Sequence, residues 1–196
     1  IITSISIEEN YDTFYIGYKD HLERYKAELT PNFERKLNFN FTYKIIDFAI
    51  GFTPTFLKSD KSVNHSSNFN FSFRLNHDQW SQSFMYMNQN GFYLDLDNTI
   101  EHLYFPQFKS TKIGGTTSYI FNKNYSYQTL FNPTEWQSKS TGSFILHFTA
   151  YYSKLESKKK EDDFNINIYS ITTSPSYYYN FVINKKVETS LSLLCG

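Results

Sequence analysis

The sequence predicts an all-β protein, namely an antiparallel up-and-down transmembrane β-barrel of about 10–12 strands. The first observation is the composition, because 20 Phe, 17 Tyr and 2 Trp make the chain 20% aromatic, and aromatic residues favour strands. The second is an alternation of apolar and polar residues in runs of about ten, the length that a tilted strand needs to cross a bilayer. The mean hydropathy of −0.52 excludes a bundle of membrane helices.

The alternating runs place the expected strands in order along the chain. In residues 33–43 the odd positions include Phe39 and Phe41, whereas the even ones include Asn38 and Asn40. The same period of two recurs in residues 21–29, 48–56, 69–75 and 144–152. We also expect two strands within 164–184, an uncharged stretch whose polar residues and Pro175 indicate strands that meet at a turn.

Connections of two lengths join these runs. We expect tight hairpins at 122–124, between strands 116–121 and 125–131, and at 184–186, between 177–183 and 187–195. Longer polar connections are expected at 58–67, 95–112 and 153–163. Short turns at one end and long loops at the other are typical of outer-membrane barrels. Residues 21–196 are predicted to form the barrel domain, and residues 1–20 an N-terminal periplasmic segment.

The residue types on the two faces favour a barrel over a soluble sandwich. One face is rich in Phe and Tyr, and the opposite face is mostly Asn, Ser and Thr, as expected for a lipid-facing wall around a polar lumen. Tyr clusters at 151–152 and 177–179 lie near expected strand ends, where an interfacial aromatic girdle forms. A soluble β-sandwich alternates in the same way and stays open as an alternative.

Residues 119–144 resemble a family of domains of unknown function that are predicted outer-membrane β-barrels from Bacteroidota. Members of that family carry an aromatic-Ser-Tyr strand and then Gln-x-x-Ser-x-Gly-Ser-Phe, and the matching residues are Tyr125, Ser126, Tyr127, Gln137, Ser140, Gly142, Ser143 and Phe144. The resemblance implies a barrel in the bacterial outer membrane that contacts lipid and lipopolysaccharide, without an established activity. It also implies further strands after Gly196.

Few residues suggest chemistry. Lys+Arg and Asp+Glu are both 19, and this balance argues against a nucleic-acid partner. His65 and Ser67 superficially resemble the His and Ser of lipid A deacylases, but we expect a polar loop there. Asp95 and Asp97 lack the Gly and Glu of a calcium loop, so no metal site is expected. His147 is expected to point into the lumen as a hydrogen-bonded filler. A lumenal charge ladder is expected from residues on the polar faces, namely Arg24, Lys26, Glu34, Lys36 and Arg74.

We therefore expect a non-enzymatic outer-membrane β-barrel without a cofactor, acting as a structural or accessory subunit of a larger envelope complex with other outer-membrane proteins. Three alternatives stay open. They are a lipid A-modifying membrane hydrolase that uses His65 and Ser67, a narrow pore, and a soluble β-sandwich binding protein.

Overall fold

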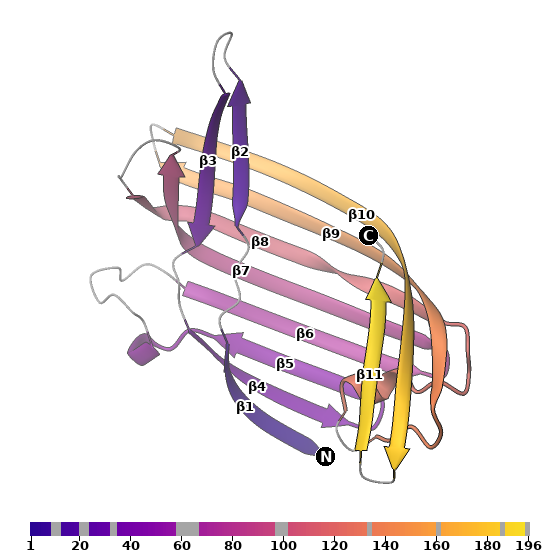
Figure 1. Cartoon of the computed structure of the whole chain (residues 1–196). Coiled ribbons are helices and arrows are strands. Elements are labelled where there is room, and N and C mark those ends of the chain that lie inside the picture. The colour runs from indigo at the N-terminus through magenta and orange to yellow at the C-terminus, as the bar shows by residue number, and fades with distance from the viewer. Residues whose placement is uncertain are drawn as a thin grey trace.

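The computed structural model describes residues 1–8, 13–19, 24–31, 35–57, 67–96, 102–132, 135–159, 162–184 and 187–194. They form two short 3₁₀ helices, η1 (Thr55–Leu57) and η2 (Tyr127–Leu130), and the strands of Figure 1, which are β1 (Ile2–Glu8), β2 (Phe14–Lys19), β3 (Arg24–Pro31), β4 (Lys36–Tyr43), β5 (Ile46–Phe52), β6 (Ser67–His77), β7 (Trp80–Leu96), β8 (His102–Ile120), β9 (Thr141–Lys159), β10 (Asp162–Asn184) and β11 (Val187–Leu194). Among these residues no helix has the length and apolar content that crossing a bilayer requires.

All of these strands belong to one 11-stranded sheet with the order β1-β4-β5-β6-β7-β8-β9-β10-β11. Every pairing is antiparallel, and from β4 onward consecutive strands are neighbours. The β2–β3 hairpin joins through β3, which pairs with residues 92–96 of β7, beyond the residues that pair with β6. The predicted all-β, up-and-down, antiparallel architecture is therefore confirmed.

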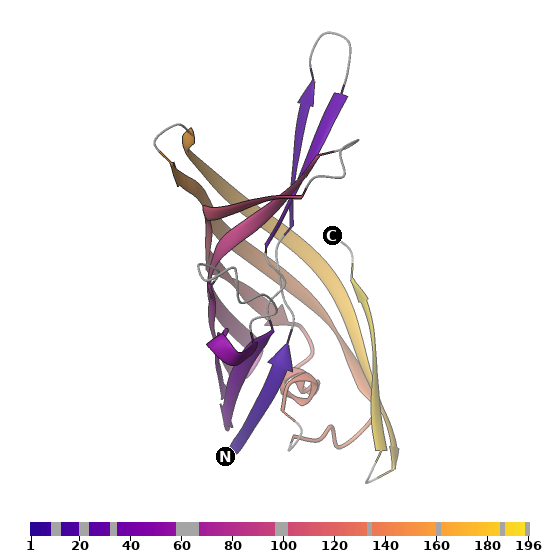
Figure 2. The same ribbon diagram turned by 90° about the vertical axis from the view of Figure 1, so that its left-hand side faces the viewer.

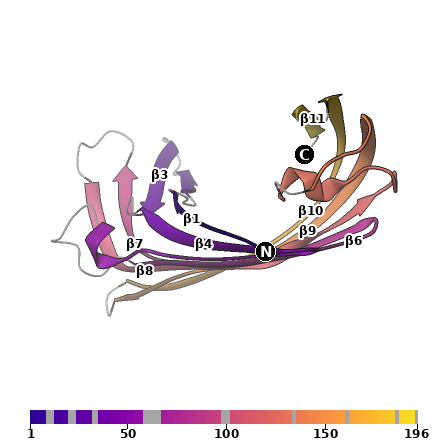
Figure 3. The ribbon, with the colours of Figure 1, turned by 90° about the horizontal axis from the view of Figure 1, so that it is seen from below.

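The sheet curls into a trough and does not close (Figures 2 and 3). The edges of the order β1-β4-β5-β6-β7-β8-β9-β10-β11 are β1 and β11, each of which has one neighbouring strand among the described residues. The barrel expected from the sequence is thus present as an open, curved sheet. Both strands within residues 1–20 belong to this sheet, because β1 pairs with β4 and β2 pairs with β3.

The prediction of long loops at 95–112 and 153–163 is wrong for most of both segments. Residues 102–112 continue β8, and residues 153–159 continue β9. These polar segments stay in the sheet because their side chains find cross-strand partners, as when Lys109 Nζ lies 3.8 Å from Glu156 Oε1.

The expected turn at Pro175 is also wrong, since β10 runs through it as one 23-residue strand. The ladder between β10 and β11 ends at Ser176, so Pro175 lies where β9 is the described neighbour of β10. A residue without an N–H is tolerated at such an edge.

The expected strand at 125–131 is replaced by a loop. Residues 121–140, here called the inner loop and described except for 133 and 134, connect β8 to β9 and contain η2. The chain turns away from the sheet because Tyr125, only 4% exposed, packs beneath the loop against Ile120 and Ile145. A second apolar cluster lies toward the β2–β3 hairpin and comprises Leu29, Phe92, Phe108 and Leu155, with Phe14 and Phe105 packed against it.

Candidate functional site

The two faces of the trough differ sharply in chemistry. The alternation places rings on the convex face, where Phe71 contacts Phe48 at 5.4 Å and Phe84 at 6.0 Å between ring centroids. The concave face, toward which the inner loop folds (Figure 3), carries mostly Asn, Ser and Thr, with the charged residues Lys36, Asp47 and Arg74 among them. The concave face is therefore the candidate site.

The inner loop is fastened to the concave face through Asn180 of β10. The Tyr125 hydroxyl donates to Asn180 Oδ1 at 3.2 Å, and Asn180 Nδ2 donates to Thr129 Oγ1 at 2.9 Å. The Ser190 hydroxyl of β11 donates to the same Oδ1 at 2.8 Å. One fully buried amide thus joins the loop to two strands.

Gln137 closes the inner loop on itself. Its Oε1 accepts from the Ser126 N–H, and its Nε2 donates to the Asn124 carbonyl, both at 2.8 Å. Gln137 is 6% exposed, and both of its partners are backbone groups of the inner loop. Ser140 adds a tie to β10, because its Oγ accepts from the Val182 N–H at 2.9 Å.

The return of the loop into β9 depends on Gly142 and Ser143. The Asn122 N–H donates to Ser143 Oγ at 3.0 Å, and Ser143 Oγ donates to the Phe144 carbonyl at 2.7 Å. A Cβ on Gly142 would lie 2.7 Å from the Tyr178 carbonyl oxygen, so a side chain does not fit there. The expected turn leading into a strand is confirmed. All the motif residues except Phe144 serve the inner loop, and Phe144 lies on the convex face, 5.4 Å from the Phe121 ring.

His147 lies under the inner loop, on the concave face where the alternation predicts it. Its Nδ1 is 2.7 Å from Ser118 Oγ and its Nε2 is 2.8 Å from Ser176 Oγ, so both ring nitrogens are hydrogen bonded. The ring of Tyr127 lies 6.3 Å away and packs against Tyr178 at 5.7 Å. Burial, together with the neighbouring Tyr178, raises the pKa of Tyr127 to about 12, so this phenol stays neutral over the ordinary pH range.

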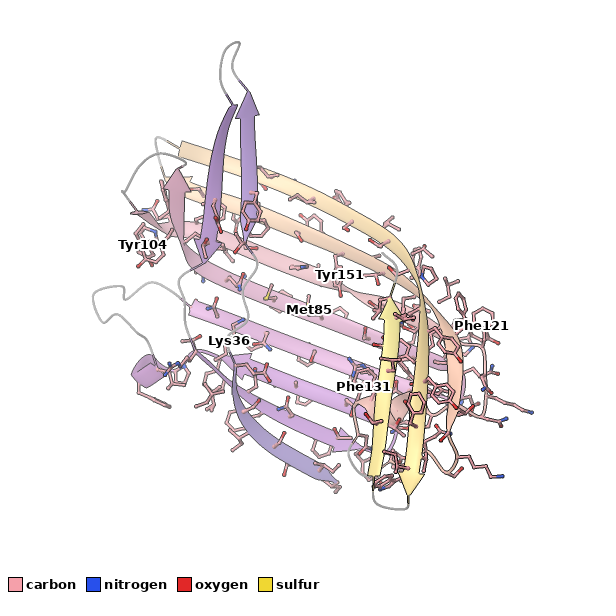
Figure 4. The ribbon with its side chains drawn as sticks, in the orientation of Figure 1. Lys36, Met85, Tyr104, Phe121, Phe131 and Tyr151 are labelled. Carbon is pink, nitrogen blue, oxygen red and sulfur yellow. The ribbon has the colours of Figure 1, made fainter. Side chains whose placement is uncertain are left out.

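Beside the inner loop the concave face is hollowed. One hollow of about 650 Å³ is lined by Asp47, Ser72, Arg74, Met85, Phe131 and Tyr151 among others. A second, of about 460 Å³, shares Ser72 and Met85 with the first and continues to Lys36 and Lys112. Figure 4 labels Lys36 and Met85 of this lining, and Phe131 and Tyr151 of the first hollow. Gly114 admits the Tyr151 ring to this surface, because a Cβ at Gly114 would lie 2.4 Å from Tyr151 Cδ1.

Arg74 and Asp47 are the charged residues of the first hollow. The Arg74 guanidinium carbon lies 3.6 Å from the centroid of the Phe131 ring, which is cation–π geometry. Asp47 is directly opposite Arg74 in the β5–β6 ladder, yet it accepts from Thr42 Oγ1 at 2.8 Å and from Asn76 Nδ2 at 3.4 Å.

Of the other residues singled out in the sequence, the structure describes only some. Ser67 begins β6, is exposed, and accepts from Asn90 Nδ2 at 2.8 Å, whereas His65 lies outside the described residues. Glu34 and Asp97 also lie outside them, as do the side chains of Arg24, Lys26 and Asp95. Of the expected charge ladder, Lys36 and Arg74 are described, and both lie on the concave face.

Sequence reasoning missed Asn180 and the Arg74–Phe131 contact. Period two places Asn180 on the polar face, but its partners are Tyr125 and Thr129, more than fifty residues away. Phe131 was expected in a strand, so its ring on Arg74 had no signal in the sequence.

A family model described as Domain of unknown function (DUF4421) matches residues 1–196. No curated protein and no solved structure matches the chain.

Proposed function

The chain belongs to the DUF4421 family, and we propose that the protein is a non-enzymatic β-barrel of the bacterial outer membrane, acting as a structural or accessory subunit of a larger envelope complex. The observation that carries the proposal is the order of side chains along the convex face of each long strand. Lipid and lipopolysaccharide are the proposed surroundings of that face, and other outer-membrane proteins are the proposed partners.

An apolar stretch bounded by rings recurs on neighbouring strands. The convex residues of β9 are, in order, Phe144, Leu146, Phe148, Ala150, Tyr152, Lys154 and Glu156. On β7, Trp80 and Tyr86 bound the stretch before Asn88, and on β10, Tyr177 and Tyr169 bound it before Asn167. Aromatic girdles around an apolar band, with polar side chains beyond, are the pattern of outer-membrane barrels.

One girdle runs from the start of β7 across the end of β8 and the inner loop to the start of β9. Ring centroids are 4.8 Å apart for Trp80 and Tyr119, 5.0 Å for Tyr119 and Phe121, and 5.4 Å for Phe121 and Phe144. At the other end the Tyr152 and Tyr169 rings are 5.1 Å apart, and the Tyr152 hydroxyl donates to Asn167 Oδ1 at 2.8 Å. This second girdle thus combines ring contacts with a polar neighbour.

The height of the band fits a membrane. The eight-residue step from Phe144 to Tyr152 covers about 26 Å of strand at ~3.3 Å per residue. With a tilt of about 40°, the band is about 20 Å tall, close to the ~25 Å typical of outer-membrane barrels. Within it, Thr117 Oγ1 donates to Gln82 Oε1 at 2.8 Å, so the Thr117 hydroxyl and the Gln82 carbonyl oxygen are paired with each other.

The exposure of the band supports burial against a further medium. Phe84, Phe144 and Phe148 are 40%, 44% and 50% exposed, and no second sheet covers them among the described strands. A continuous apolar surface of this kind on a soluble protein marks a site that something else covers. Hydrocarbon chains would cover it on all strands at once. Unpaired backbone in lipid costs several kcal/mol per group, so the proposal includes pairing of the β1 and β11 edges.

The concave face supports a structural role over a conducting one. The inner loop occupies one end of the trough, and the apolar cluster of Leu29, Phe92, Phe108 and Leu155 occupies part of the other. Side chains fill the interior of a small barrel in the same way.

Fluorescence quenching from within the bilayer tests the proposal. In a background of Trp80→Phe and Trp136→Phe, a single Trp replaces either Phe84, on the convex face, or its neighbour Met85, which lines the concave hollow. In vesicles whose lipids carry bromine on the acyl chains, we expect strong quenching of F84W and little quenching of M85W.

The two variants carry their Trp at adjacent positions of one strand. Each therefore serves as a control for how well the other variant inserts into the vesicles. Equal and weak quenching of both, or recovery of the parent protein in the aqueous phase without detergent, would contradict the membrane proposal.

A further inference from the structure

We propose that the first hollow of the concave face binds a small organic anion, whose carboxylate or phosphate group is held by the guanidinium of Arg74. This inference goes beyond the proposed function and does not depend on lipid contact by the convex face. It rests on how Arg74 is positioned and on what it does not bind.

The guanidinium of Arg74 has N–H donors to spare. It makes no hydrogen bond and no ion pair with any residue that the structure describes. It contacts the Phe131 ring at 3.6 Å, and its charge acts to lower the pKa of the nearby Tyr127. A guanidinium presents several N–H donors in a planar fork and accepts none. A ring against one face of that plane leaves the donors at its edge directed elsewhere.

The carboxylate best placed to neutralise Arg74 is engaged by other groups. Asp47 is the cross-strand partner of Arg74, but one of its oxygens accepts from Thr42 and the other from Asn76. Both donors are neutral side chains, and Asp47 forms no ion pair with Arg74. Arg74 and Asp47 therefore lie opposite each other in the ladder without forming an ion pair.

The inner loop holds the ring that orients Arg74. Phe131 packs edge-on against Tyr127, with centroids 5.2 Å apart and an interplanar angle of 78°. Tyr127 in turn packs against Tyr178 of β10. This chain of contacts fixes the plane of the guanidinium before a ligand arrives, which reduces the entropy lost on binding.

The hollow has the size and the lining of a small-molecule site. Its volume of about 650 Å³ falls within the common range of ligand pockets, roughly 300–1,000 Å³. Ser72 and Ser83 supply hydroxyls, and Met85 and Tyr151 supply apolar surface. A planar fork binds carboxylate and phosphate in a bidentate manner, so the two groups share one recognition chemistry.

Two probes separate the two sources of that chemistry. Sodium acetate and sodium phosphate are titrated into the intact purified protein at constant ionic strength, and the midpoint of thermal unfolding is followed. We expect a saturable rise with at least one probe, and the probe that binds more tightly identifies carboxylate or phosphate. Arg74→Gln should abolish the rise, and Arg74→Lys, which keeps the charge without the fork, should weaken binding about tenfold.

Phe131→Leu and Lys44→Gln complete the design. The first keeps Arg74 but removes its ring, so binding should weaken several-fold even if Arg74→Gln does not fold. The second removes a cation that lies over Tyr43, outside the hollow, and should leave binding unchanged. No saturable response of the parent protein, or the same response in Arg74→Lys, Phe131→Leu and the parent, would overturn the inference.

Discussion

At the scale of single residues, the concave face is held by a few polar side chains that each satisfy several partners. Gln137 and Asn180 are the main examples, since each is buried and both amide atoms of each are bonded. When one partner of such a buried amide is removed, the amide atom that it bonded is left without a hydrogen bond, at a cost of about 1–3 kcal/mol. These two residues therefore fix the inner loop in one conformation.

Tyr127 gives this region a pH dependence that can be measured. Burial raises its pKa to about 12, above the ordinary value of 10.0, so the unfolded chain loses this proton first as the pH rises. The free energy of unfolding should be unaffected by Tyr127 below about pH 10 and should fall between about pH 10 and pH 12, by roughly 1 kcal/mol per pH unit. The charged or titratable groups that face Tyr127 are Arg74, Tyr178 and His147.

The measurement is urea unfolding of the parent protein and of Tyr127→Phe at about pH 9 and about pH 11. Because the other tyrosines titrate in both proteins, the quantity of interest is the difference between them. We expect the parent to lose about 1 kcal/mol more than the variant over this interval. An equal loss in the two proteins would show that Tyr127 ionises as a free phenol does.

At the scale of elements, the long central strands depend on close backbone contact. Gly115 of β8 pairs with Phe84 of β7, and a Cβ at Gly115 would lie 2.1 Å from the Ser83 carbonyl oxygen. The obstacle is backbone, so relief requires the two strands to separate. The two adjacent glycines, Gly114 and Gly115, thus let β8 lie close to the neighbouring strand on either side.

We expect Gly115→Ala to destabilise the protein by about 2–3 kcal/mol, the cost of overpacking that a sheet cannot relieve. Gly51→Ala is the matched control, because the added Cβ would meet the side-chain amides of Asn38 and Asn70, which can turn aside. Its cost should be about 1 kcal/mol or less. Urea unfolding measures both, and a smaller loss for Gly115→Ala than for Gly51→Ala would contradict this account.

At the scale of the whole molecule, the open trough raises the question of its edges. The outer backbone groups of β1 and β11 have no partner strand among the described residues, whereas central strands such as β7 are paired on both sides. An unpaired edge is tolerated in water and is costly in hydrocarbon. The membrane proposal therefore has a consequence for the edges that is independent of side chains.

In lipid vesicles we expect the amides of β1 and β11 to exchange hydrogen about as slowly as those of β7. β2 supplies the internal control, since its described partner is β3 alone and it lies beyond the apolar band, so its amides should exchange quickly. Hydrogen exchange followed by mass spectrometry resolves these segments. Fast exchange of β1 and β11 beside a slow β7 would show that the edges stay open in lipid.

The strands that sequence periodicity predicts best are those with one apolar and one polar face. The expected runs 33–43, 69–75 and 144–152 correspond to β4, β6 and β9, and His147 lies on the face that the alternation assigns to it. Strand length was harder to predict. Lys109 and Glu156 look like loop residues, but their ion pair across the β8–β9 ladder stabilises them within the sheet.

The sequence by itself determined the all-β class, the antiparallel up-and-down architecture and the separation of rings from amides and hydroxyls, because these follow from residue type and a period of two. Only the tertiary structure decided that Tyr125 leaves the sheet, that Asn180 fastens the inner loop and that Arg74 faces Phe131 instead of Asp47. Such contacts join residues far apart in the chain, and they depend on which groups the curvature of the sheet brings together. The period of two along a strand does not predict that curvature.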